Sequence, residues 1–139
     1  MQTICKIKKH VSQMAAGEKS FLLGKFQDIP SFMWSFTDYS KKRLAGRGIS
    51  ETDFKALFTK YDLIEFHVGD HGKGGDPRIL LRSRTTTEKY NFEVCAVFSL
   101  RDARVVTIWI NHVTNQHDNV VMANYTKKYD IMQNWKGRL

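Results

Sequence analysis

The chain has 139 residues, which is enough for one domain with a modest core and too few for two. Hydrophobic residues make up 42% of it and aromatic residues 12%, which excludes a disordered chain, and no apolar run reaches the ~18 residues of a membrane span. The formal net charge of +8 favours an anionic ligand. RNA is the first candidate, because the basic residues are spread over several segments instead of one amphipathic helix.

The sequence contains no metal-binding or redox motif. Neither HExxH nor CxxC occurs, so no metal and no cofactor are expected. Cys5 and Cys95 are the only cysteines; they favour a reducing interior, although a single bridge between them stays open. No secretory signal is readable in Met1–Lys9.

The first segment, residues 1–20, is polar, basic and weakly patterned. Ile4, Ile7 and Val11 would line one side of a short helix that ends near Gly17. An arm or linker from a larger parent protein is an equal alternative for this segment.

Residues 21–139 are expected to form the single folded domain. Its first part, residues 21–36, is rich in aromatic side chains but is interrupted by Gly24 and Pro30. These breaks predict loops and short helical turns that cover the core.

Two short helices follow. Thr37 or Asp38 is a suitable N-cap for a helix over residues 39–46, which Gly46 would end. Ser50 and Asp53 have the spacing of a capping box and predict a second helix start. The apolar face of this second helix consists of Phe54, Leu57, Phe58 and Tyr61.

The rest of the chain predicts mainly strands, at residues 63–68, 78–84, 90–100 and 103–112. A glycine-rich hairpin loop separates the first two strands, and strict apolar alternation makes the third strand central. The tail, residues 117–139, is expected to add a short strand or helix that docks. The fold class is therefore α+β, with N-terminal helices packed on one face of a twisted antiparallel sheet of four to five strands.

The strand at residues 104–112 has two chemically different faces. Side chains alternate across a strand, so a threonine, an indole and an amide share one side and make a surface suited to a polar, planar ligand. The apolar face is expected to consist of Val106, Ile108 and Ile110, and the polar face of Thr107, Trp109 and Asn111.

Basic side chains are grouped at two places. Tyr39, Arg43 and Arg47 lie at i, i+4 and i+8 and form either a phosphate cradle or a solvated basic face. Arginines alternate along the strand at residues 78–84, where they indicate either an anion partner or charge that protects an edge strand. The arginines of this second group are Arg78, Arg82 and Arg84.

Histidine is the side chain best suited to proton transfer near neutral pH, as a metal-independent ribonuclease requires. No pair of histidines has metal-ligand spacing. The five are His10, His67, His71, His112 and His117.

The segments at residues 36–50 and 105–109 carry a resemblance to a known family. Phe36-Thr37-Asp38-Tyr39 with Arg43 before Arg47-Gly48-Ile49-Ser50, and then Val105-Val106-Thr107-Ile108-Trp109, resemble motifs of the barnase/EndoU/colicin/RelE superfamily of metal-independent endoribonucleases. This superfamily includes toxin domains used in contact-dependent growth inhibition. The resemblance covers about residues 36–112, and Tyr39 stands where the family pattern has histidine.

The resemblance implies roles for the candidate site residues. Arg43 and Arg47 would neutralise phosphate charge, Thr107 would contact the phosphate, and Tyr39 would donate to it. Trp109 and Asn111 would hold a base. Further candidates, for proton transfer or substrate contact, are His112, His117, His71 and Arg82.

Two functions from different classes remain open. The first is an endoribonuclease toxin that cleaves RNA, with tRNA as the expected substrate, in the bacterial cytoplasm, through attack by the 2′-hydroxyl. Such a toxin would be a monomer when free, would be neutralised by an acidic immunity protein or antitoxin, and could be delivered as part of a larger secreted protein. The second is a non-catalytic RNA-binding or partner-binding module of phage or plasmid origin, which the tyrosine at position 39 suggests. A membrane partner is not expected.

Overall fold

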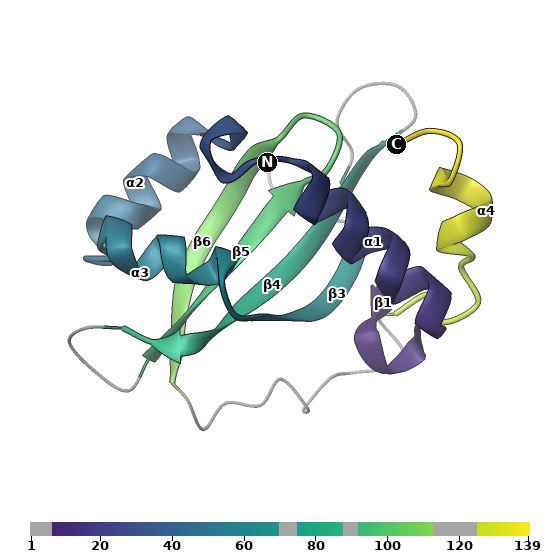
Figure 1. Cartoon of the computed structure of the whole chain (residues 1–139), viewed down its shortest axis with the longest axis horizontal. Coiled ribbons are helices and arrows are strands. Elements are labelled where there is room, and N and C mark those ends of the chain that lie inside the picture. Colours follow the sequence, from purple (N-terminus) through teal and green to yellow (C-terminus); the bar gives the residue numbers. More distant parts are fainter. Residues whose placement is uncertain (1–6, 70–74, 88–91, 113–124) are drawn as a thin grey trace.

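The computed structural model describes residues 7–69, 75–87, 92–112 and 125–139 (Figure 1). The strands in these ranges are β1 (Ile7–His10), β2 (Ser35–Phe36), β3 (Tyr61–Gly69), β4 (Asp76–Thr86), β5 (Phe92–Ser99) and β6 (Arg104–His112). The helices are α1 (Ala16–Asp28), α2 (Asp38–Gly46), α3 (Glu51–Lys55) and α4 (Ile131–Trp135), with 3-10 turns η1 (Val11–Gln13), η2 (Ser31–Met33) and η3 (Ala56–Phe58). None of the helices in the described ranges is long and apolar enough to cross a membrane.

The strands form one sheet in the order β1-β3-β4-β5-β6-β2. Every neighbouring pair is antiparallel except β2 and β6, which are parallel. Helices α1, α2 and α3 lie over one face of the sheet, and α4 lies beside α1 (Figure 1). The α+β fold is confirmed, with one strand more than the largest number predicted, and the predicted central strand is β5, which lies in the interior of the sheet.

The main core lies between this sheet face and the helices. Short-range aromatic packing dominates it: the Phe26 ring of α1 is stacked on Phe58 at 5.6 Å and contacts Phe98 of β5 edge-on at 5.0 Å. Trp135 of α4 is almost completely buried and meets the Phe66 ring of β3 at 6.5 Å. The C-terminal segment therefore docks as predicted, through a helix.

The first residues depart from the prediction. Ile7–His10 form a strand paired with β3, so the short helix expected through Ile7 and Val11 is wrong. The aromatic segment after residue 20 is also more regular than predicted, because α1 continues to Asp28. Gly24 does not interrupt this helix and has no positive φ. Residues 7–20 thus belong to the sheet and the helix layer.

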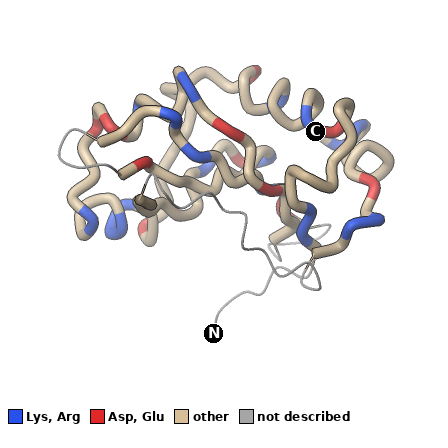
Figure 2. Tube along the Cα trace, turned by 90° about the horizontal axis from the view of Figure 1, so that it is seen from below, with Lys and Arg blue, Asp and Glu red and all other residues tan. Residues whose placement is uncertain are grey.

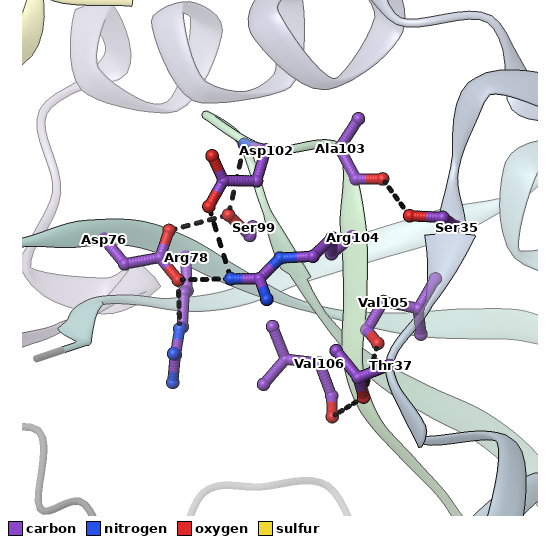
Figure 3. Close-up of polar contacts among 10 residues, drawn as sticks. All are labelled: Ser35, Thr37, Asp76, Arg78, Ser99, Asp102, Ala103, Arg104, Val105 and Val106. Atoms are coloured by element: carbon purple, nitrogen blue, oxygen red, sulfur yellow. Dashed lines mark hydrogen bonds and ion pairs between the residues drawn. The ribbon is translucent and has the colours of Figure 1, made fainter. Parts of the chain in front are cut away.

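The two helix starts predicted from capping residues are confirmed. The Thr37 hydroxyl accepts a hydrogen bond from the Ser40 amide at 3.1 Å, and Ser50 and Asp53 form the reciprocal capping box of α3. The Thr37 hydroxyl also lies 3.3 Å and 3.2 Å from the carbonyl oxygens of Val105 and Val106 (Figure 3). This contact holds the start of α2 against β6.

A β-bulge changes the predicted faces of β6. Thr107 pairs with Val97 but Val105 pairs with Phe98, so Val106 is an extra residue in β6. Val105 and Ile108 are fully buried in the main core, whereas Val106 packs on the opposite face of the sheet. The apolar stripe predicted through Val106 is therefore wrong at that residue, because alternation shifts at the bulge.

Candidate functional site

The face of the sheet opposite the helices, called the open face below, carries the polar residues predicted on β6. Thr107, Trp109 and Asn111 pair in register with Val97, Cys95 and Glu93 of β5, so all three side chains share this face, as predicted. Trp109 packs on a small apolar cluster around the fully buried Cys95. This cluster fixes the indole at the surface, with Thr107 and Asn111 beside it and half-buried.

A row of mostly basic residues crosses the open face. Register pairs connect its members directly from β1 through β3, β4 and β5 to β6. Paired residues of neighbouring strands point to the same side, and adjacent strands lie ~4.8 Å apart. We call this set the basic row: Lys8, His67, Arg78, Ser99 and Arg104.

Asp76 organises the two arginines of this row (Figure 3). Its side chain is 1% exposed, and it accepts a hydrogen bond from Arg78 Nε at 2.9 Å and from the Ser99 hydroxyl at 2.6 Å. Arg104 Nη2 lies 3.9 Å from the same carboxylate and 3.2 Å from that of Asp102. One buried carboxylate thus orients two guanidinium groups from different strands.

His67 lies in the basic row between Lys8 and Arg78. It is 9% exposed, and its Nδ1 is buried without a hydrogen-bond partner. Burial, together with the positive charges of Arg78 and Lys8, lowers the pKa of His67 to about 4, although Asp76 acts in the opposite direction. The imidazole is therefore neutral at neutral pH and lies in a positive environment.

A second polar cluster on the open face joins β1, β3 and the C-terminal segment. His10 pairs in register with Glu65, and the Tyr125 hydroxyl donates a hydrogen bond to Glu65 at 3.0 Å. The Tyr125 ring meets the His10 ring edge-on at 5.7 Å, and Lys8 Nζ lies 5.7 Å from its centroid. Burial and the Glu65 carboxylate raise the pKa of Tyr125 to about 12, so the phenol remains a donor.

Sequence reasoning named Arg78, His10 and His67 as members of larger sets but did not bring these groups together. The basic row depends on residues from five strands, and only the register reveals that Lys8 and Arg104 belong with Arg78. Alternation within the predicted β4 strand was the one available signal, since it placed Arg78 on the same face as Arg82. Strand β1 was not predicted, which left Lys8 and His10 without a place.

Arg82 was proposed from the sequence as a substrate contact, but its guanidinium group bonds to other residues of the sheet. Its side chain is 7% exposed and contacts Glu93 through Nε at 3.0 Å and Nη2 at 2.9 Å. It also donates a hydrogen bond to the His112 carbonyl at 2.9 Å. Arg84 is exposed and forms an ion pair with Asp62. These contacts favour a structural role for Arg82 in joining β4, β5 and the end of β6.

The Tyr39 group lies on α2, the helix that packs against β6. The Arg43 guanidinium lies 5.6 Å from the centroid of the Tyr39 ring, and Tyr39 is 56% exposed. Arg47 follows α2 and borders a pocket of about 270 Å³ that Ile110 lines on the helix side of the sheet. Within the described part of the chain, no hydrogen bond or ion pair joins Tyr39 or Arg43 to Thr107. Helix α2 packs against β6, but these contacts do not join the two parts of the predicted site directly.

His112 lies within the described part of the chain, unlike the other two histidines proposed for the site. His112 is exposed at the end of β6, with its ring edge-on to Phe92 at 5.6 Å. His71 and His117 lie outside the described residues, as does Cys5. Cys95 is a free thiol, and burial raises its pKa to about 12, so it is protonated and unreactive at neutral pH.

A larger apolar pocket lies among the helices. Its volume is about 760 Å³, and half of the residues that line it are aromatic. Phe32 and Met33 beside it are exposed, and the buried Trp34 Nε1 has no hydrogen-bond partner. The only charged residues that line it are Glu51 and Lys55, which form an exposed ion pair with each other. This pocket lacks the charge that the open face offers to an anion.

Lys and Arg residues lie along several separate elements, with Asp and Glu between them (Figure 2). The basic charge is thus distributed and is not confined to one helix. No protein-family model, curated protein or solved structure matches this chain.

Proposed function

We propose that the chain is a metal-independent endoribonuclease that binds RNA across the open face of its sheet. One observation carries the proposal: Thr107, Trp109 and Asn111 share this face with the two guanidinium groups held by Asp76. Guanidinium groups bind phosphate oxygens through paired hydrogen bonds. An indole and an amide beside them suit an unstacked RNA base.

The reaction would be an intramolecular transesterification. The 2′-hydroxyl oxygen forms a bond to phosphorus while the bond from phosphorus to the 5′-oxygen breaks, which yields a 2′,3′-cyclic phosphate and a 5′-hydroxyl. Arg78 and Arg104 would stabilise the charge of the phosphorane, and Thr107 would add a hydrogen bond. A base takes the proton of the 2′-hydroxyl and an acid protonates the leaving oxygen.

The decisive experiment incubates total RNA with the purified chain in EDTA, followed by sequencing of the RNA ends. Discrete cuts that end in 2′,3′-cyclic phosphates are expected. Thr107→Val keeps the shape of the side chain and removes its hydroxyl, so we expect a rate loss of about a hundredfold, or on the order of 3 kcal/mol in the barrier. Thr86→Val, at an exposed position of β4, is the control. Equal rates for both variants would refute the site.

A non-catalytic RNA-binding module is the second candidate. The tyrosine at position 39 favours it, because the family pattern has histidine there and a lost catalytic residue can leave a binding module. A shift of labelled RNA in native gels without any cleavage, by a folded chain, would select this function.

The substrate and the partner extend the same proposal. We propose tRNA as the substrate in the bacterial cytoplasm, and an acidic immunity protein or antitoxin as the neutralising partner. The net charge of +8 would accelerate association with such a partner at low ionic strength. Association rates that do not change between low and high salt would contradict this electrostatic account.

A further inference from the structure

We propose that Arg78 and Arg104 form a preorganised site for one phosphate group, and that Asp76 is the positioning residue that sets their geometry. The inference deepens the proposed function, because it assigns the phosphate to the basic row and not to Arg43. It depends on contacts within the sheet and can be tested without any RNA cleavage.

The position of the Arg78 guanidinium is fixed from two sides. Its Nε is bonded to Asp76, and the guanidinium lies over Gly69, the β3 residue paired with Asp76. A Cβ atom at Gly69 would lie 2.6 Å from Arg78 Nε and 2.8 Å from Nη2. Only a residue without a side chain leaves space for the guanidinium at this position.

Both arginines retain donors for a ligand. Arg78 uses Nε toward Asp76 and forms no other hydrogen bond or ion pair with the described residues, which leaves its terminal nitrogens available. Arg104 uses Nη2 toward Asp102 and Asp76, and its Nε is buried without a partner. Asp76 and Asp102 balance the two guanidinium charges, and Lys8 of the basic row leaves the set with a net charge of +1, so it still attracts an anion.

His67 supplies a second, independent observation. Its Nδ1 is buried without a partner beside Arg78 in the register. An orphaned buried polar atom is uncommon and calls for an explanation, such as a ligand that the atom serves. The charged groups that face His67 are Lys8, Arg78 and Asp76, and together they carry a net positive charge. A bound phosphate would compensate this positive environment.

Phosphate is the ligand class that these groups fit. Guanidinium nitrogens in a fixed plane donate two parallel hydrogen bonds to tetrahedral oxyanions, and their charge does not depend on pH near neutrality. Because one carboxylate already holds both guanidinium groups, less side-chain entropy is lost when the ligand binds. The phosphate source is either a free ion or the diester of a nucleic-acid backbone.

The test is a titration of the full chain followed by NMR, in which the side-chain Nε–H signals of Arg78 and Arg104 report binding. One arm uses inorganic phosphate and the other a 2′-O-methyl oligonucleotide, which lacks the attacking hydroxyl. We expect saturable shifts of both signals, and at least tenfold weaker binding for Arg78→Gln and Arg104→Gln. Arg84→Gln is the matched control, because it removes the same charge from the exposed end of β4.

Two further variants distinguish the effect of guanidinium position on binding from the effect of charge. Gly69→Ala keeps every charge and displaces the Arg78 guanidinium, so binding should weaken several-fold. Asp76→Asn removes a negative charge. If charge alone decided the affinity, anion binding would become stronger. We expect it to become weaker, because the two guanidinium groups are no longer held in place. If Asp76→Asn does not fold, Gly69→Ala carries the comparison alone.

The outcomes are distinct. Shifts with the oligonucleotide alone would identify a backbone diester as the ligand and support the site. Equal weakening by Arg84→Gln and Arg78→Gln, unchanged binding in Gly69→Ala, or tighter binding in Asp76→Asn would overturn the proposal. Absence of shifts in both arms would also overturn it, even if RNA cleavage were observed. Phosphate binding without cleavage would instead leave this site standing and remove the proposed ribonuclease activity.

Discussion

The buried ion pair between Lys9 and Glu18 offers a quantitative test of how the N-terminal segment is held. Lys9 Nζ lies 2.8 Å and 2.9 Å from the two carboxylate oxygens, and both side chains are 7% exposed. Lys9 also donates to the Tyr129 carbonyl at 2.9 Å, and Glu18 accepts from the amides of Ala15 and Ile131 at 2.9 Å and 3.0 Å. The pair thus joins β1, α1 and the start of α4.

Lys9→Met should destabilise the fold by about 3–5 kcal/mol, because it leaves the Glu18 carboxylate buried without its cation. Unfolding of a chain of 139 residues carries an entropy of about 0.3 kcal/mol per kelvin, so a loss near 4 kcal/mol corresponds to a fall of about 14 °C in Tm. Urea denaturation followed by circular dichroism measures the loss directly. The double variant Lys9→Met/Glu18→Gln should lose less than the sum of the single variants, since the two residues interact.

The exposed pair of Glu51 and Lys55 on α3 is the control, and Glu51→Gln should cost about 0.5 kcal/mol or less. A pH series adds an independent check. Burial alone raises the pKa of Glu18, but the hydrogen bonds from Lys9 and the two amides outweigh it and leave the pKa below the ordinary 4.5. The stabilisation is then complete above this value and is lost as pH falls through the lowered pKa. If Lys9→Met unfolds within 1 kcal/mol of the parent chain, the reasoning is refuted.

Three further predictions use other parts of the sheet. The pKa of His67 is lowered from 6.5 to about 4, so the unfolding free energy should fall by about 3 kcal/mol as pH drops from 6.5 to 4, and His67→Gln should flatten this dependence in urea titrations. Arg82→Gln leaves Glu93 buried without its cation and should destabilise the fold by about 3–5 kcal/mol; a change in RNA affinity without a change in stability would argue for a direct contact instead. Trp109→Leu retains apolar packing but loses the stacking surface, so RNA affinity measured by fluorescence anisotropy should fall by about 1–3 kcal/mol, and an unchanged affinity would exclude base stacking there.

Local signals in the sequence predicted much of the fold. The caps at Thr37 and Ser50 act within three residues, so their hydrogen bonds could be anticipated without tertiary information. The four long strands followed from alternation. Strand β1 could not be predicted in this way, because Lys9 points to the main-core side of the sheet and is tolerated there only through its ion pair with Glu18. Alternation cannot anticipate a buried charge whose partner lies on another element.

The candidate site was less predictable than the fold. The common face of Thr107, Trp109 and Asn111 followed from the two-residue period of a strand, and it is confirmed. The bulge at Val106 was not visible, since it depends on how β5 and β6 pair. The association of Arg78 with Arg104 requires the order of the strands and the burial of Asp76 between them. Sequence spacing carries neither.

The short parallel strand β2 has a consequence for how the chain behaves at high concentration. An outer strand with unpaired amide and carbonyl groups can recruit a strand from another molecule and start aggregation. Here the Ser35 and Thr37 amides donate to the carbonyls of Ala103 and Val105, and α2 then continues alongside β6. The outward backbone groups at the start of β6 are already satisfied within the molecule, so this part of β6 cannot pair with a strand of another molecule.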